Sequence, residues 1–580
     1  MSTLFEGIHD GDVDAVVRAL RSGEPAEADQ DGETALYRAA LADEPGIVRV
    51  LLAAGADPAR GGGAEGGDLA LCAAACGGHA EVARALLAAG ARPDQEEAYG
   101  FTAMAWAVRL GHAETVRVLL EHGADPDRPG PDGLPPLVAA ARRGSTSSVR
   151  ALLDHGAAAR EDALHEARRW IGVDVAGAVL RGLLDAYGSQ PYEAVVRRVR
   201  EDGGITVVVD LLRPDGTPGS GNEQQTGHAA IATLLETALG IRVPPEELAA
   251  RALRCEDPEL DDWTEAVAAL AGRGDEETFR AAAAWCAADD GLRRALGASV
   301  LGSLEGFTAP SLAVLCRLAA ETAKGVGAAG GTPAWDTAPG RVASPAGVGA
   351  AGRTPASDTA PGQVASPTGV GAAGRTPASD TAPGWVASPT ADTADPVAPA
   401  DPAGRGGREP ALAVVTALGR VASPTADAAG PGGEPKGLAE LSAFAAHPDA
   451  EVRRALATAL TGLVPAGHAP ALDILLALSR DHDSRVRDWA TLALAEVPGD
   501  TPALREALAA RLGDADPDVV AEAARGLAMR QDPRATEALA ALLADGARDG
   551  TARETALAAL EFVRDERVRN RLEWTSPRCR

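Results

Sequence analysis

The chain has 580 residues, with 83 Asp and Glu against 55 Lys and Arg and a formal net charge of −28. This length predicts several domains or one long array, because a single hydrophobic core stops growing beyond roughly 250–300 residues. The acidic balance argues against nucleic acid and anionic membrane surfaces as partners, since both attract basic proteins.

The composition predicts a mostly helical, soluble protein of the cytoplasm. Aromatic residues make up only 3% of the chain, whereas Ala, the strongest helix former, is abundant. The six cysteines show no disulfide framework, and no apolar run reaches the ~18 residues that a membrane span needs. The first residues are partly acidic and lack an apolar core, so we expect no signal peptide.

A phrase of similar wording recurs through the first part of the chain: RVLLAAGADP at 49–58, RALLAAGARP at 84–93, RVLLEHGADP at 117–126 and RALLDHGAAA at 150–159. Its glycine returns roughly every 33 residues. Each copy ends a unit with two short helices, each stopped by a glycine, as in GFTAMAWAVRLGHAETVRVLLEHGAD at 100–125.

This pattern resembles the ankyrin repeat family over residues 1–160, with IHDGDVDAVVRALRSG at 8–23 similar to its N-terminal capping repeat. The resemblance implies stacked helix pairs and a concave surface that binds another protein. It also implies where that protein is contacted: around the Gly that opens a unit and at the two positions before the Gly that ends the first helix. In this sequence these positions are Tyr99, Phe101, Arg109, Leu110, Asp132, Leu134, Arg142 and Arg143.

Residues 161–260 are predicted to be a helical region that caps one array and begins another. ITVVVDLLRPDGT at 205–217 is rich in β-branched residues and ends in a Pro-Asp-Gly turn, which predicts a short hairpin. TGHAAIATLLETALGI at 226–241 resembles an ankyrin second helix.

A second rhythm appears late in the chain, in HPDAEVRRALATAL at 447–460, DHDSRVRDWATLAL at 481–494 and DADPDVVAEAARGL at 514–527. Each copy places Asp at a helix start, where its side chain caps the first turn, and follows it with an apolar row. These units resemble HEAT repeats, an α-solenoid family, in their compact bacterial form with D-x-x-V-R. We expect such repeats over 261–323 and 408–580.

Residues 324–407 differ in kind. The 22-residue phrase GVGAAGRTPASDTAPGQVASPT at 347–368 recurs almost unchanged at 369–390 and with changes at 325–346. Such a composition cannot bury enough apolar surface to offset the entropy of ordering. We therefore expect a long disordered insertion here and a minor one at 421–436. Neutral filler is the favoured interpretation; a tether and a Ser-Pro/Thr-Pro phosphorylation target stay open.

The sequence shows none of the common motifs of nucleotide-binding loops, zinc proteases or serine hydrolases. Cys72, Cys76 and His79 lie close together but lack a fourth ligand, so neither a metal nor a cofactor is expected. The nearest hint of catalysis is Asp488 with Trp489, because some HEAT-like solenoids act on chromophores or damaged bases.

We therefore predict an all-α chain of two helical solenoids, an ankyrin array and then a HEAT-like array, with a long disordered insertion. The predicted function is a non-catalytic protein-interaction scaffold or adaptor with an unidentified protein partner. Two alternatives stay open. One is a HEAT-solenoid enzyme similar to a lyase or glycosylase, and the other is a regulatory protein whose two arrays dock on each other. The oligomeric state is also left open.

Overall fold

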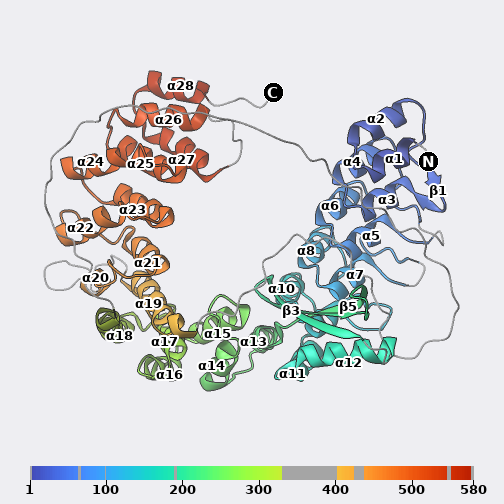
Figure 1. The fold of residues 1–580 in the computed structure, drawn as a ribbon, viewed down its shortest axis with the longest axis horizontal. Coiled ribbons are helices and arrows are strands. Elements are labelled where there is room, and N and C mark those ends of the chain that lie inside the picture. The colour runs from blue at the N-terminus through green and yellow to red at the C-terminus, as the bar shows by residue number, and fades with distance from the viewer. Residues whose placement is uncertain are drawn as a thin grey trace.

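The described helices stack into one continuous solenoid that bends into an open ring (Figure 1). The N-terminal arm and the C-terminal arm face each other across the ring and are joined end to end through its base. The computed structural model describes residues 3–62, 67–97, 100–188, 192–329, 402–422, 437–544 and 550–575. The predicted insertions at 324–407 and 421–436 lie largely outside these residues.

The N-terminal arm consists of helix pairs whose boundaries follow from the repeated sequence. Thr102 caps the first helix of a unit by accepting a hydrogen bond from the backbone N–H of Ala105. Gly111 ends that helix with φ 80°, a backbone conformation that favours glycine. The pairs in this arm are α1 (Thr3–His9), α2 (Val13–Arg21), α3 (Ala35–Leu41), α4 (Pro45–Ala53), α5 (Ala70–Gly77), α6 (Ala80–Ala88), α7 (Ala103–Leu110), α8 (Ala113–Glu121), α9 (Pro136–Arg143) and α10 (Thr146–Asp154).

The array continues beyond the boundary expected at residue 160. Helix α11 (Arg160–Trp170) packs on α9, and α13 (His228–Ala238) packs on α10 and α11. The core of this arm accordingly includes Ile231 and Leu235 of α13. We therefore assign α11 and α13 as the two helices of one further unit, in agreement with the resemblance of 226–241 to an ankyrin second helix.

Two histidines show the same repeat geometry on both sides of that boundary. The ring Nε2 of His112 lies 3.1 Å from the carbonyl oxygen of Cys76, and that of His228 lies 3.2 Å from the carbonyl oxygen of Arg142. Each carbonyl belongs to the residue two positions before the glycine that ends the preceding first helix. Because His228 repeats the contact of His112, α13 occupies the place of a second helix in the stack.

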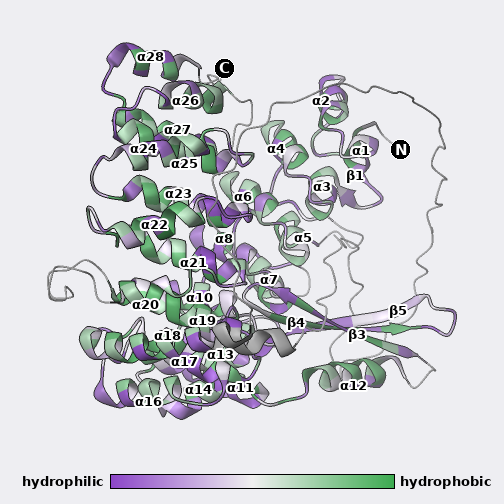
Figure 2. Cartoon of the chain, turned by 60° about the vertical axis from the view of Figure 1, so that its left-hand side comes forward, coloured by the Kyte–Doolittle hydropathy of each residue, from purple (hydrophilic) through white to green (hydrophobic). Residues whose placement is uncertain are grey.

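An inserted α/β module separates α11 from α13. It comprises α12 (Val175–Tyr187) and an antiparallel sheet of order β3-β4-β5, with β3 at Glu193–Glu201, β4 at Gly204–Leu212 and β5 at Pro218–Gln225. The predicted hairpin at 205–217 is the β4–β5 part of this sheet, so the strand content exceeds the expectation. Figure 2 shows the module projecting from the N-terminal arm. Helix α12 covers alternate side chains of β4: Val207, Val209 and Leu211.

The C-terminal arm has a second core, which runs from Val243 to Leu572. Its aspartate-capped helices begin where the repeated sequence predicts, as at Asp483, which accepts hydrogen bonds from the N–H groups of Arg485 and Val486. The described helices are α14 (Pro245–Leu253), α15 (Asp261–Ala271), α16 (Glu276–Cys286), α17 (Gly291–Leu301), α18 (Thr308–Ala329), α19 (Pro402–Val421), α20 (Leu438–Ser442), α21 (Ala450–Leu460), α22 (Ala469–Leu478), α23 (Ser484–Glu496), α24 (Pro502–Arg511), α25 (Pro517–Met529), α26 (Ala535–Ala544), α27 (Thr551–Ala559) and α28 (Glu566–Thr575).

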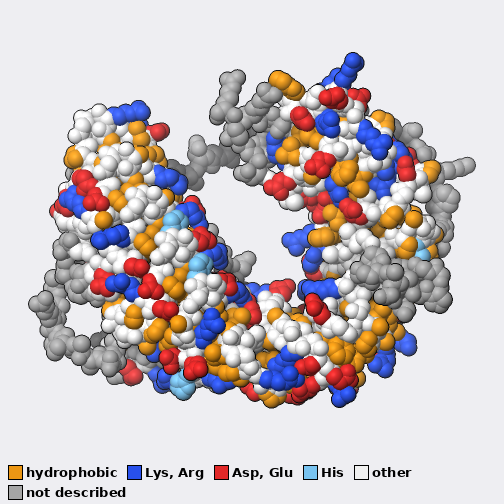
Figure 3. Space-filling model, turned by 180° about the vertical axis from the view of Figure 1, so that it is seen from behind, with side chains coloured by type: hydrophobic (Ala, Val, Ile, Leu, Met, Phe, Trp, Pro, Cys, Tyr) orange, Lys and Arg blue, Asp and Glu red, His pale blue; other side chains and the backbone are white. Residues whose placement is uncertain are grey.

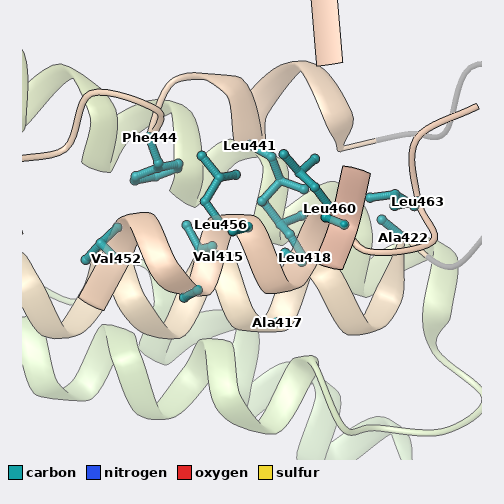
Figure 4. Packing of buried hydrophobic residues seen from close by; sticks show 14 of the residues in the cluster. Val415, Ala417, Leu418, Ala422, Leu441, Phe444, Val452, Leu456, Leu460 and Leu463 are labelled. Carbon is teal, nitrogen blue, oxygen red and sulfur yellow. The ribbon is translucent and has the colours of Figure 1, made fainter. Parts of the chain in front are cut away.

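The stack of the C-terminal arm continues across the predicted long insertion. Helix α19 packs on both α17 and α18, which precede the insertion in sequence. The approach is close, because a Cβ built on Gly302 would lie 2.7 Å from the Cβ of Ala417. On its other side, α19 buries Val415 and Leu418 against Leu456 and neighbouring side chains of the next unit (Figure 4). Each unit therefore packs on its neighbours in space even where a long insertion separates them in sequence.

A buried ion-pair network joins the two arms. Glu236 on α13 is 1% exposed and accepts hydrogen bonds from Arg168 on α11 at 2.7 Å and from Arg251 on α14 at 2.6 Å. Nearer the start of α13, the backbone N–H of Ala230 donates a hydrogen bond to Asp262 on α15 at 3.0 Å. These contacts fix the end of one array against the start of the next. No helix in the described part of the chain combines the length and apolarity that crossing a membrane requires.

Candidate functional site

An aromatic and cationic cluster lies at the start of α7. The rings of Phe101 and Trp106 stack with centroids 4.3 Å apart, and the Arg109 guanidinium carbon lies 5.9 Å from the centre of the Phe101 ring. All three side chains are half-buried. Trp106 and Arg109 are three residues apart on the helix, so they share a face. A cation over an aromatic ring is an attractive contact that also presents both groups to a partner.

Glu97, on the loop before α7, contacts this cluster through Trp106. Its carboxylate accepts a hydrogen bond from the Trp106 indole Nε1 at 2.6 Å. Burial raises the pKa of Glu97, and the negative charge of Asp68 adds to this effect, although the hydrogen bond from Trp106 opposes it. Burial together with the same acidic surroundings raises the pKa of Tyr37 to about 12. The cluster thus lies beside an acidic belt, defined here as Asp68 and Glu97.

The predicted contact residues of the first unit are partly brought together. Phe101 and Arg109 meet in the cluster, and Leu110 lies half-buried at the end of the same helix. Tyr99 lies outside the described residues. The family positions did not include Trp106 and Glu97, although an aromatic residue at the helix position facing Phe101 was a visible signal in the sequence.

In the next unit, Asp132 is exposed and Leu134 is half-buried on the loop before α9. The Asp132 carboxylate accepts a hydrogen bond from the backbone N–H of Leu134 at 3.2 Å, which shapes a local turn. This pair therefore offers one charged and one apolar group.

Arg143, a predicted contact residue, is buried by the chain itself rather than exposed to a partner. Its side chain is 9% exposed and donates to the backbone oxygen and to the carboxylate of Glu223 on β5. The Gln224 side chain donates to the backbone oxygens of Arg142 and Arg143 at 2.9 and 2.6 Å. The reason is topological: α13 must begin beside Gly144 to complete the interrupted unit, and this draws the end of β5 across α9. Arg142 keeps a half-exposed side chain, paired with a carboxylate of α11.

The Val-Arg arginines of the C-terminal arm form a ladder between units. Arg453 donates two parallel hydrogen bonds to Asp481 at 2.7 and 2.9 Å, and Arg487 does the same to Asp514 at 2.9 and 2.8 Å. In the third unit Val520 takes the arginine position. Because each pair joins the start of one helix to the loop of the next unit, the ladder has a structural role.

The residues considered for catalysis do not assemble into a recognisable reaction centre. Trp489 packs against the second core. Burial raises the pKa of Asp488 to about 6, with a further contribution from the charges of Glu522, Asp518 and Asp516. Burial also raises the pKa of the Cys72 thiol well above its ordinary value, so this thiol stays protonated. Within the described ranges, no group of three or more His, Cys, Asp or Glu side chains is placed to hold a metal ion.

Comparison with known families identifies both repeat types. Residues 31–61 match the family model for ankyrin repeat, residues 60–130 match the model for ankyrin repeats (3 copies), and residues 438–513 match the model for HEAT repeats. The chain matches no curated protein. Repeats of both families are generally protein-interaction modules and typically lack catalytic activity. The chain therefore carries ankyrin repeats in residues 31–130 and HEAT repeats in residues 438–513, joined in a single helical solenoid.

Proposed function

We propose that the chain is a non-catalytic protein-interaction scaffold whose ankyrin arm holds a protein partner at the Phe101–Trp106–Arg109 cluster. The stack of two half-buried rings under a guanidinium is the observation that carries this proposal. Aromatic residues and arginine dominate binding energy in protein interfaces, because they remove much surface from water in few rotamers. Leu110, Asp132 and Leu134 are proposed as the surrounding rim, and Tyr99 stays a predicted contact residue.

The acidic belt beside the cluster favours a partner segment with a positive charge. Glu97 lies directly behind Trp106, and the chain as a whole carries a formal charge of −28. Charge complementarity of this kind steers encounter and suppresses wrong partners. Acidic and basic side chains are interspersed on the face of the ring seen in Figure 3, so we propose no role for it in binding nucleic acid.

The test uses the full-length chain and its native cell extract. The double variant Phe101→Ala/Arg109→Ala removes one ring of the stack and the cation. We expect recovery of the partner by affinity capture to fall at least about tenfold, since loss of hot-spot side chains costs ~2 kcal/mol or more. The matched control is Arg117→Ala, an arginine on α8 that is 48% exposed and pairs with Glu114.

Three outcomes are distinguishable. Loss of the partner from the double variant with full recovery by Arg117→Ala supports the site. If both variants and the unchanged chain recover the partner equally, the Phe101–Trp106–Arg109 site is contradicted. The scaffold proposal would then depend on a partner that binds another surface of the chain. Turnover of a substrate by the purified chain that is lost in Asp488→Ala would instead support the enzyme alternative.

A further inference from the structure

A pocket lined by both charged and apolar side chains lies where the inserted module leaves the ankyrin arm. It has a volume of about 340 Å³ and opens between the ends of α9 and α11 and the start of α12. Helices α9 and α11 supply its charged residues and Trp170, and the segment that follows α11 adds the apolar Val173 and Ala178. The lining residues are Arg142, Glu166, Arg169, Trp170, Val173 and Ala178.

Two arginines in this pocket share one buried carboxylate. The Glu166 side chain is 9% exposed and accepts hydrogen bonds from Arg142 Nε and from Arg169 Nη1, both at 3.0 Å. Burial acts to raise the pKa of Glu166, but the hydrogen bonds and charges of Arg142, Trp170 and Arg169 outweigh it and hold the pKa below its ordinary value. Glu166 is therefore ionised, and the three groups together carry one net positive charge.

Both guanidinium groups have donors to spare. A guanidinium carries five N–H donors, and the bonds to Glu166 use one from each arginine. Their side chains are 47% and 64% exposed. Asp174, the nearest acidic residue of the inserted segment, has its carboxylate at the N-terminus of α12, where it accepts from the N–H of Gly177 at 3.1 Å. Asp174 therefore already occupies the N-terminal end of α12.

The apolar wall is fixed in position. The Trp170 ring stacks on His228 with centroids 5.2 Å apart, and its indole Nε1 lies 3.4 Å from Glu166. Val173, beside it, is 39% exposed although it is a large apolar side chain. A single net positive charge next to an apolar wall suits a monoanionic carboxylate with an apolar neighbour better than a dianionic phosphate.

We propose that this pocket binds a carboxylate of an acidic peptide segment, with the neighbouring apolar side chain of that peptide on Trp170 and Val173. The inference rests on the proposed protein-binding function and names the chemistry of a partner segment. It concerns a surface separate from the Phe101 cluster. Arg142, a predicted contact residue, acts here through its guanidinium.

The probe is acetyl-Leu-Glu-Leu-amide, compared with acetyl-Leu-Gln-Leu-amide, in ligand-observed NMR titrations of the full-length chain. We expect weak binding of the Glu peptide and about tenfold weaker binding of the Gln peptide, because only the carboxylate makes charge-assisted hydrogen bonds. A third peptide, acetyl-Leu-Leu with a free C-terminus, distinguishes a terminal carboxylate from a side-chain carboxylate. Equal binding of the Glu and Gln peptides would overturn the proposal.

Two variants assign the binding to this pocket. Arg142→Met/Arg169→Met removes the donors, and Val173→Asp adds a negative charge without touching the bonds to Glu166. Both are expected to abolish binding of the Glu peptide, whereas Arg117→Met on α8 keeps it. Should the arginine variant fail to fold, Val173→Asp still decides. Full binding of the Glu peptide by Val173→Asp would overturn the proposal that this pocket binds it. The proposed function is tested separately: if Phe101→Ala/Arg109→Ala loses its protein partner, that function still holds.

Discussion

The two arms hold their repeats together by different chemistry. In the ankyrin arm, a half-buried or buried histidine donates to a backbone carbonyl of the preceding unit, as His112 does to Cys76 and His228 does to Arg142. In the HEAT arm, a charged guanidinium bridges to the aspartate of the following unit, as Arg453 does to Asp481. Neutral hydrogen bonds contribute less than charge-assisted bidentate pairs. We therefore expect the removal of one such arginine to cost more stability than the removal of one such histidine.

The arms also differ in how they accommodate inserted sequence. In the ankyrin arm the inserted module interrupts a unit between its two helices and docks on the array through Glu223 and Gln224. In the HEAT arm the helices that flank the long insertion, α18 and α19, pack directly on each other. Both arrays keep their stacking despite the inserted sequence, because every unit is stabilised by its spatial neighbours rather than by chain continuity. The insertion in the ankyrin arm, however, changes which surface stays exposed.

The joint between the arms gives the largest expected effect. Arg251→Met removes the buried partner of Glu236 and leaves only the half-exposed Arg168 paired with it, so we expect a loss of about 3 kcal/mol in the unfolding free energy of the joint. Urea unfolding should then separate into two transitions, one for each arm, when Trp fluorescence and circular dichroism are followed together. The control is Arg280→Met, which removes an arginine on α16 whose side chain is 74% exposed. A single unchanged transition would show that the network does not couple the arms.

The two kinds of contact between units can be compared directly. Arg453→Met removes the guanidinium partner of the buried Asp481 carboxylate, which keeps the hydrogen bond from the backbone N–H of Asp483 at 3.0 Å, and should cost about 2 kcal/mol. His112→Ala removes one hydrogen bond to a backbone carbonyl and should cost about 1 kcal/mol. The side chains of Arg453 and Asp481 are 7% and 9% exposed. Chemical denaturation of the full chain measures both. Equal losses of unfolding free energy would show that the two kinds of contact contribute alike to the stability of their arms.

The smallest expected effect concerns Asp488, whose pKa in the folded chain is about 6 against an ordinary value of 3.8. Because the folded state holds this proton more tightly, the ionised carboxylate destabilises the fold above pH 6, and the penalty disappears as the pH falls toward 4. Asp488→Asn should therefore raise the unfolding free energy by about 1 kcal/mol at pH 7.

The same variant should give little gain at pH 4.5, and that pH dependence separates a titration effect from repacking. A gain of equal size at both pH values would assign the effect to packing of the side chain. Asp565→Asn, at the exposed start of α28, is the control for the effect of removing one negative charge from an exposed position.

The repeats were predictable because each one is a local pattern. Thr before a helix, Gly after it and an apolar row between them suffice to place α7 and α8, and Asp before Val-Arg places α21 and α23. The completed unit of α11 and α13 was only half visible, because its helices are separated by the inserted module. Strand β3 was missed because its arginines obscure the alternation of apolar residues: EAVVRRVRE shows no regular period of two.

The candidate site was predictable to the extent that it follows family positions. Phe101 and Arg109 occupy such positions and do meet. Trp106 and Glu97 join them through packing that no position in the family pattern specifies. Arg143 occupies an equivalent position, yet it is covered by a residue 80 positions later in the chain.

The sequence by itself determined the units of this protein, their order and the chemistry of their helix ends, because these depend on residues within one or two turns of each other. Only the tertiary structure decided that the two arrays share one stack, that Glu236 ties them together and that β5 closes part of the ankyrin surface. Those features depend on contacts between distant segments, and their energy comes from burial that exists only once the whole solenoid has assembled.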